Sequence, residues 1–111
     1  MFADWHSVSN QGVKGSSDRS ILVLTSLADG PKHGYALIKD IEAFAGVKMG
    51  SGTLYNSISK LEEAGLIEAL PAEERRYPYR ITAEGVSVLS ERLNESARIA
   101  RLGLRRLAGA M

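Results

Sequence analysis

At Gly65 the hydrophobic pattern of the chain changes from the spacing of a helix to that of a strand. Before Gly65, apolar residues recur three and four positions apart in three short segments. After it, two short apolar runs flank the polar loop 71–76. Three helices followed by a β-hairpin are the element order of a winged helix-turn-helix. We therefore expect a mainly α-helical fold with a small β-hairpin and a long C-terminal helix.

The first two helices have clear signals at their ends. Asp18 is the expected N-cap of the first helix, and Gly30 with Pro31 prevents its continuation. The second helix opens at His33–Tyr35 and closes at Gly46. Its expected apolar face consists of Leu37, Ile38, Ile41 and Phe44.

The third helix is expected at about residues 52–64, between a predicted N-cap at Ser51 and a stop at Gly65. Its predicted inner face carries Leu54, Ile58 and Leu61. Its predicted outer face carries Thr53, Asn56, Ser57 and Lys60. A solvated helix face normally carries more charge, so this polar face is a candidate binding surface.

The hairpin is expected to pair residues 66–70 with residues 77–81. Pro78 cannot donate a hydrogen bond to a strand ladder, so we expect it at an edge or a bulge. Thr82 is the predicted cap of the last helix. The expected organisation is a flexible arm at 1–17 that contains Phe2 and Trp5, a winged helix-turn-helix at 18–82 and a dimerisation helix at 83–111.

Composition limits the other function classes. The chain has 14 basic and 13 acidic side chains, so a nucleic acid would have to meet a local basic face. No cysteine and only two histidines are present, so we expect no metal centre and no other cofactor. No paired carboxylates, Ser-His-Asp arrangement or glycine-rich phosphate loop indicates an enzyme. No apolar run is long enough for a membrane span, and no signal peptide is recognisable, so we expect a cytoplasmic protein.

A helix-turn-helix reads DNA by placing its second helix, here the third of the chain, in the major groove. Helix N-termini attract phosphate, and a wing can place an arginine in the minor groove. The predicted contacts with double-stranded DNA therefore come from three segments: Lys32, His33, Tyr35, Ser51, Gly52, Thr53, Tyr55, Asn56, Lys60, Arg75 and Arg76. The alternative is that these residues only cap helices and form a solvated loop.

The last helix carries a long apolar stripe. Its members are three and four residues apart and are Val86, Leu89, Leu93, Ala97, Ala100, Leu104 and Leu107. So small a body cannot cover a stripe of this length, so we expect a second copy to pair with it. A homodimer predicts a palindromic DNA operator. The alternative is a helix that folds back onto its own domain.

Three motifs stand in a fixed order along the chain: GPKHGYALI at 30–38, SGTLY at 51–55 and LEEAGLI at 61–67. Together they resemble the PadR family of bacterial transcriptional regulators, and residues 76–85 resemble the second wing strand of that family. The resemblance implies a winged-helix repressor that dimerises through its C-terminal helix. Ser51 and Asn56 stand where the family usually has Pro, which leaves open the base sequence that is read.

A second function class, a winged-helix protein-interaction module that binds no DNA, stays open. It is favoured by the charge balance of residues 31–80, which hold seven basic and seven acidic side chains. The resemblance also implies that some members sense small molecules at aromatic pockets. The last helix has no aromatic residue, so the sequence leaves open whether an effector binds. It also leaves open whether the protein represses or activates transcription.

Overall fold

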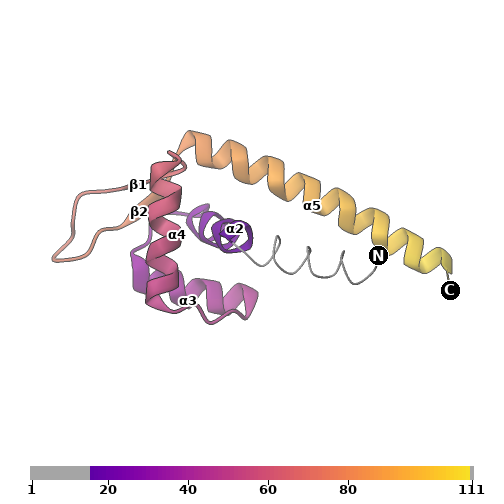
Figure 1. Cartoon of the computed structure of the whole chain (residues 1–111), viewed down its shortest axis with the longest axis horizontal. Coiled ribbons are helices and arrows are strands. Elements are labelled where there is room, and N and C mark those ends of the chain that lie inside the picture. Colours follow the sequence, from indigo (N-terminus) through magenta and orange to yellow (C-terminus); the bar gives the residue numbers. More distant parts are fainter. Residues whose placement is uncertain (1–15, 111) are drawn as a thin grey trace.

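A computed structural model describes residues 16–110 of the chain. Its elements follow the predicted order of a winged helix-turn-helix (Figure 1). They are α2 (Ser16–Leu27), α3 (Gly34–Ala45), α4 (Ser51–Glu63), β1 (Ile67–Ala69), β2 (Tyr79–Ile81) and α5 (Ala83–Ala110). Most of the predicted arm, including Phe2 and Trp5, lies outside the described residues.

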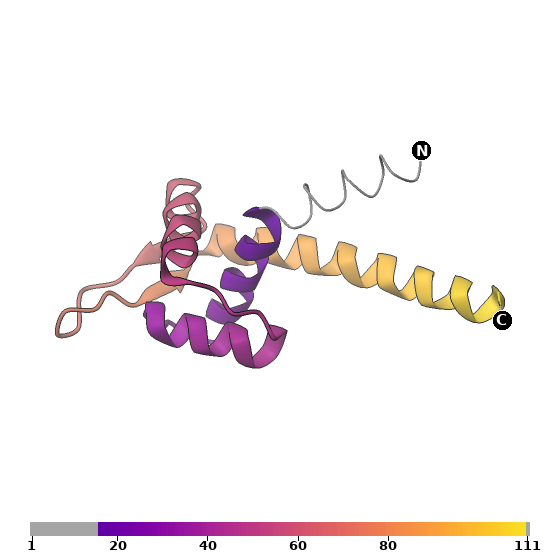
Figure 2. The ribbon, with the colours of Figure 1, turned by 60° about the horizontal axis from the view of Figure 1, so that its bottom comes forward.

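The hydrophobic core lies where α2, α3 and α4 pack together (Figures 1 and 2). Each helix contributes residues at helical spacing, and β1 and α5 add one each: Val23, Leu24, Leu27, Leu37, Ile41, Leu54, Ile58, Leu61, Ile67 and Leu89. Burying one such leucine or isoleucine stabilises the fold by about 1.5–3 kcal/mol. This packing fixes α4 by its inner face and leaves its outer face exposed.

The strands β1 and β2 form an antiparallel hairpin in which Ile67 lies opposite Ile81. Both strands are shorter than the runs predicted from the sequence. The reason is Pro78, which precedes β2 and has no N–H for the ladder. Its carbonyl still accepts a hydrogen bond from the N–H of Leu70, at 2.8 Å. Because the sheet has two strands, Pro78 leads into an edge strand, which agrees with the prediction of an edge or a bulge.

A backbone bridge ties the base of the hairpin to the start of α3. The N–H of Lys32 donates to the carbonyl of Tyr79 at 3.1 Å, and the N–H of Tyr79 donates to the carbonyl of Lys32 at 2.9 Å. At its far end the hairpin turns between Glu73 and Arg76, where Glu74 adopts a left-handed backbone with φ of 57°. The wing is thus anchored beside α3 at one end and free at the other.

The start of α5 is fixed by a cap and a close contact. The hydroxyl of Thr82 accepts a hydrogen bond from the N–H of Gly85 at 3.0 Å, which confirms the predicted cap. A Cβ at Gly85 would lie 2.7 Å from Cγ1 of Ile81 and nearer still to the carbonyl oxygen of Leu66, so the junction requires glycine. Beyond Leu89, α5 runs away from the body, on the side opposite the wing (Figures 1 and 2).

The residues 90–110 of α5 are all exposed, so this helix does not fold back onto the part of its own domain that the structure describes. Within residues 16–110, no helix combines the length and the apolar character needed to cross a bilayer.

Two predicted caps are wrong. The helix α2 is already formed at Ser16, so Asp18 lies inside it and is no N-cap. The N-cap of α4 is Gly50, and Ser51 is its first helical residue. Ser, Asp and Gly all tolerate positions near a helix start, so the sequence places the boundary only to within one or two residues.

Three residues face a different way from the predictions. Ser57 is buried, because it lies three residues after Leu54 and four before Leu61 and so shares their inner face. Phe44 is 46% exposed, because it lies in the last turn of α3, beyond the last residue of that helix that the core covers. Leu89, predicted in the dimer stripe, is buried in its own domain.

Candidate nucleic-acid interface

The outer face of α4 presents the polar residues that the sequence singled out. Its buried side chains, Leu54, Ile58 and Leu61, hold the helix on the core. On the opposite side, exposed positions include Ser51, Gly52, Tyr55, Asn56 and Lys60, while Thr53 is half-buried. The first turn of α4 contains no acidic residue. The start of α4 therefore offers hydroxyl, amide and backbone donors without a repelling carboxylate.

The start of α3 offers a second group of donors. His33 is the N-cap residue, and no side-chain hydrogen bond caps the first turn of the helix among the described residues. The Nδ1 atom of His33 is buried and has no hydrogen-bond partner among the described residues. Tyr35 is 66% exposed, and the ammonium of Lys39 lies 5.6 Å from the centre of its ring. Open N–H groups at a helix start favour an anion.

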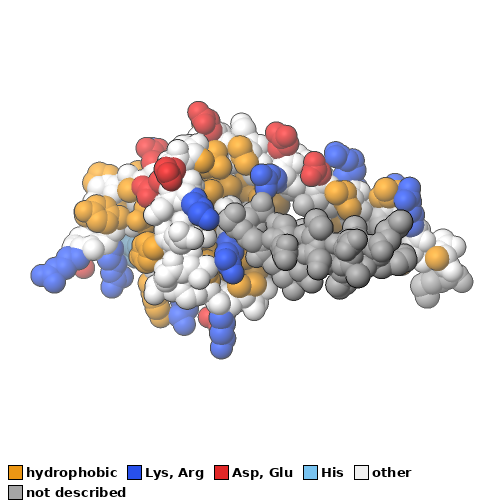
Figure 3. Space-filling view, viewed as in Figure 1, with side chains coloured by type: hydrophobic (Ala, Val, Ile, Leu, Met, Phe, Trp, Pro, Cys, Tyr) orange, Lys and Arg blue, Asp and Glu red, His pale blue; other side chains and the backbone are white. Residues whose placement is uncertain are grey.

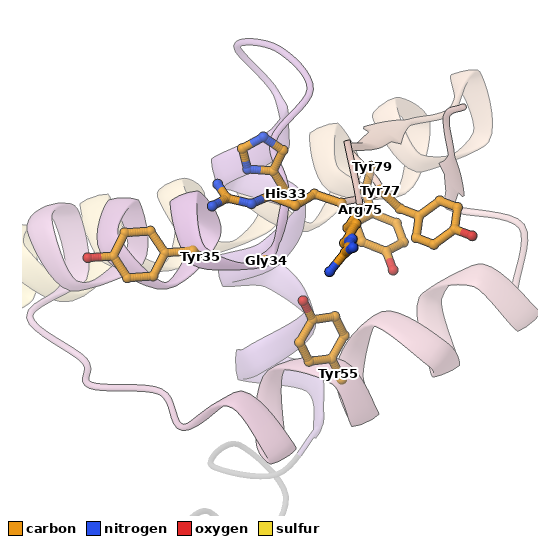
Figure 4. Close-up of a pocket in the computed structure, with 8 residues that line it drawn as sticks. His33, Gly34, Tyr35, Tyr55, Arg75, Tyr77 and Tyr79 are labelled. Atoms are coloured by element: carbon orange, nitrogen blue, oxygen red, sulfur yellow. The ribbon is translucent and has the colours of Figure 1, made fainter. Parts of the chain in front are cut away.

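Tyr55 connects α4 to the start of α3. Its phenol points from α4 toward Gly34 (Figure 4). A Cβ at Gly34 would lie 2.8 Å from Cζ of Tyr55, which is well inside van der Waals contact. The glycine at this position therefore allows the ring of Tyr55 to rest on the first turn of α3.

The wing closes over the same place. A pocket of about 350 Å³ lies between the start of α3, Tyr55 and the wing (Figure 4). Its lining consists of His33, Gly34, Tyr35, Tyr55, Arg75, Arg76, Tyr77 and Tyr79. The structure thus brings together His33, Tyr35, Tyr55, Arg75 and Arg76, which the sequence predicted on three separate segments.

Three lining residues were missed from the sequence: Gly34, Tyr77 and Tyr79. The two tyrosines are two positions apart in the second hairpin run, and that spacing puts strand residues on one face. Burial raises the pKa of the Tyr79 phenol, and the nearby negative charge of Glu62 raises it further. The phenol therefore stays protonated and remains a hydrogen-bond donor.

Lys32 does not join this group. Its ammonium donates to the carbonyl of Ser26 and to the carboxylate of Asp29, and it lies 4.0 Å from the carboxylate of Asp40. Its side chain is mostly covered. The hydrogen bond and charge of Lys32 lower the pKa of Asp29. Lys32 therefore does not line the pocket, and its ammonium is held between α2 and α3, so its DNA contact stays a prediction.

Charge is divided across the molecule. Lysine and arginine side chains lie at the end of the hairpin, along the side of α3 and also along the far half of α5 (Figure 3). Acidic side chains gather at the opposite edge, where α4 ends and α5 begins, and include Glu62, Glu63 and Glu84. Within the body of the protein, the hairpin end and the side of α3 thus form a basic side, and α4 begins beside α3 (Figure 1).

The apolar stripe of α5 is uncovered beyond Leu89. Its larger members are Leu93, Leu104 and Leu107, of which Leu104 is 68% exposed. Val86, Ala97 and Ala100 are exposed on the same side of the helix. Leaving this area in water is unfavourable by roughly 25 cal/mol for each Å². The stripe is therefore a candidate contact surface.

Fold and site together define a winged helix-turn-helix protein with an additional C-terminal helix. Residues 23–91, more than half of the chain, match the transcriptional regulator PadR-like family. The chain belongs to this family, as its sequence motifs predicted.

Similar proteins include one curated relative and several solved structures. An uncharacterized 37.1 kDa protein in transposon TN4556 of Streptomyces fradiae is 37% identical over 84 residues. The match covers 76% of this chain but only 24% of that relative, so the chain spans about a quarter of its length. A PadR family transcription regulator from Clostridium difficile R20291 is 25% identical with a TM-score of 0.72, over 79% of this chain and 96% of that one. A PadR family transcriptional regulator from Eggerthella lenta DSM 2243 is 31% identical with a TM-score of 0.64, over 96% of each chain.

Proposed function

We propose that this chain is a sequence-specific DNA-binding repressor of transcription that acts as a homodimer in the cytoplasm. Residues 18–82 would bind the DNA, and residues 83–111 would hold two copies together. The observation that carries the proposal is the common location of three donor groups on the basic side: the outer face of α4, the uncapped start of α3 and the wing arginines. A DNA duplex needs such a local basic face.

In this proposal α4 enters the major groove. The start of the helix would meet base edges through the half-buried Thr53 and the exposed Asn56, while Ser51 and Gly52 approach the backbone. An asparagine amide can form two hydrogen bonds with adenine, so Asn56 is the best candidate for base recognition.

The remaining contacts would position the protein. His33, Tyr35 and Tyr55 would meet the phosphates beside the groove, and Lys60 would do so further along α4. Arg75 and Arg76 lie on an anchored wing, where a guanidinium can enter the minor groove.

The dimer would form through α5. Pairing two copies of the exposed stripe around a two-fold axis removes the apolar area of Leu93, Leu104 and Leu107 from water. The two-fold axis would place two α4 helices to read a palindromic operator, with half-sites about 34–36 Å apart.

The test is fluorescence anisotropy with labelled DNA taken from fragments that the protein captures from its genome. Each of Thr53→Ala and Asn56→Ala should weaken binding by about 1–3 kcal/mol, which is roughly 5- to 150-fold. The control is Asn94→Ala, which removes the same amide from an exposed position on α5. If all three variants fold and bind the DNA as tightly as the wild-type protein, the proposed role of α4 is contradicted. Repression further predicts that deleting the gene raises transcription from the captured promoters.

One observation favours the alternative, a protein-interaction module. Tyr35, Tyr55 and Tyr77 are all exposed, and tyrosine is enriched at protein interfaces. This alternative predicts that no DNA fragment is enriched and that Arg75→Ala leaves DNA affinity at the non-specific level.

A further inference from the structure

Lys32 joins the wing to the link between α2 and α3. Its backbone N–H and carbonyl both pair with Tyr79, in hydrogen bonds of 3.1 and 2.9 Å. Within residues 16–110, no other backbone hydrogen bond connects this link with the hairpin. The base of the hairpin is closed by the N–H of Thr82, which donates to the carbonyl of Leu66 at 3.0 Å. The pairing with Lys32 therefore adds a point of attachment outside the hairpin itself.

The side chain of Lys32 is held on its other side by α2 and α3. Its ammonium donates to the carbonyl of Ser26 in the last turn of α2, where helix carbonyls lack a partner within the helix. It also lies 4.0 Å from Oδ2 of Asp40 in α3. The hydroxyl of Ser26, which is 1% exposed, donates to the same Oδ2 atom at 2.6 Å. The side chains of Ser26, Lys32 and Asp40 thus form one polar network between α2 and α3.

The Lys32 side chain is only 18% exposed, which restricts where its charge can go. A covered ammonium is unfavourable unless polar partners surround it. The carbonyl of Ser26 and the carboxylates of Asp29 and Asp40 are those partners. Because the ammonium loses them if it moves, the network holds the backbone of Lys32, and with it Tyr79, beside α2 and α3.

We propose that Lys32 is a positioning residue, whose side chain fixes the bridge to Tyr79 and thereby the direction of the wing relative to α3. Arg75 lies four residues before Tyr79, which corresponds to roughly 13 Å along a strand. A turn of about 10° at the base would then move Arg75 by about 2 Å, which is enough to break a hydrogen bond. Lys32 therefore acts on DNA through the wing arginines. This last step rests on the proposed function, whereas the hold on the wing does not.

Amide hydrogen exchange, followed by NMR, tests the hold on the wing without DNA. Lys32→Met removes the ammonium and keeps a side chain of similar length. We expect the N–H of Tyr79 to exchange about tenfold faster or more, and the core N–H of Ile58 to change far less. Lys48→Met removes an exposed lysine outside the network and should change neither. No acceleration at Tyr79, or equal acceleration of both amides through a general loss of stability, overturns the proposal.

A double-mutant cycle in the anisotropy assay tests how Lys32 acts on DNA. If it acts through the wing, Lys32→Met weakens DNA binding by the wild-type protein. The same change then has little further effect once Arg75→Ala and Arg76→Ala are present. A direct contact of Lys32 with phosphate would instead give the same fold-change in both backgrounds, because independent contacts add. That result overturns the action through the wing.

Asp40→Asn gives a test of opposite sign and decides the question even where Lys32→Met fails to fold. It keeps the shape of the side chain and removes a negative charge that holds the ammonium. A direct contact of Lys32 with phosphate therefore predicts DNA binding that is stronger or unchanged. Positioning by Lys32 predicts weaker DNA binding and faster exchange at Tyr79.

The two assays separate this inference from the proposed function. If Lys32→Met accelerates exchange at Tyr79 and the wild-type protein binds no specific DNA, the hold on the wing stands and the proposed function fails. If the wild-type protein binds specific DNA and exchange at Tyr79 is unchanged in Lys32→Met, the positioning role fails and the proposed function stands.

Discussion

Replacing Leu104 with Glu should turn the proposed dimer into monomers. Burying a whole leucine side chain is worth roughly 1.5–3 kcal/mol. Because 68% of Leu104 is exposed in the single chain, about 1–2 kcal/mol is available from each copy. Two copies in a symmetric dimer then lose about 2–4 kcal/mol, which raises the dissociation constant by roughly 30- to 700-fold. The unpaired carboxylates in the contact would weaken it further.

The assay is sedimentation velocity across micromolar concentrations, with circular dichroism to verify that helix content is kept. Ile99→Glu is a matched control, since Ile99 is a similarly exposed aliphatic residue of α5 that lies roughly a third of a turn away from the stripe. We expect the wild type and Ile99→Glu to sediment as dimers and Leu104→Glu as a monomer. A wild-type monomer at these concentrations, or equal dissociation of both variants, would refute the reasoning.

Three further predictions concern the body of the protein. Gly85→Ala should destabilise the fold by about 1–3 kcal/mol in thermal or denaturant melts, because its methyl collides with Ile81 and a backbone carbonyl, whereas Gly103→Ala has open space and should not destabilise it. Arg75→Ala with Arg76→Ala should weaken DNA binding across all sequences and reduce the salt slope by about one unit per lost phosphate contact; an unchanged slope would show that the wing does not touch phosphate. Tyr55→Ala should weaken DNA binding while the chain stays folded, and unchanged affinity would remove Tyr55 from the interface.

The order of elements could be predicted because each has a local signal. Gly46 and Gly65 were predicted to end their helices, and both adopt positive φ just after α3 and α4. Thr82 caps α5 as expected. Periodicity also identified Leu54, Ile58 and Leu61 as core residues, because a helix has one inner face and the spacing marks it.

What could not be predicted depends on contacts between segments. The ammonium of Lys32 lies 4.0 Å from the carboxylate of Asp40 in α3, a contact that no local pattern indicates and that follows from the packing of α3 beside α2. Likewise, Leu89 belongs to the apolar stripe by its spacing. It is nevertheless buried, because it lies in the part of α5 that packs against the body of the domain. The need for glycine at position 34 follows only from the position of Tyr55, whose ring lies against it.

The central claim is that the chain binds specific DNA as a two-fold symmetric dimer, and genome-wide capture of bound fragments tests it most directly. The account predicts that the enriched fragments share a palindromic sequence whose half-sites lie about one helical turn apart, 10–10.5 base pairs between centres. It also predicts that Leu104→Glu loses this enrichment, because a single reading helix cannot span both half-sites. No enrichment over input DNA with the wild-type protein would contradict the claim.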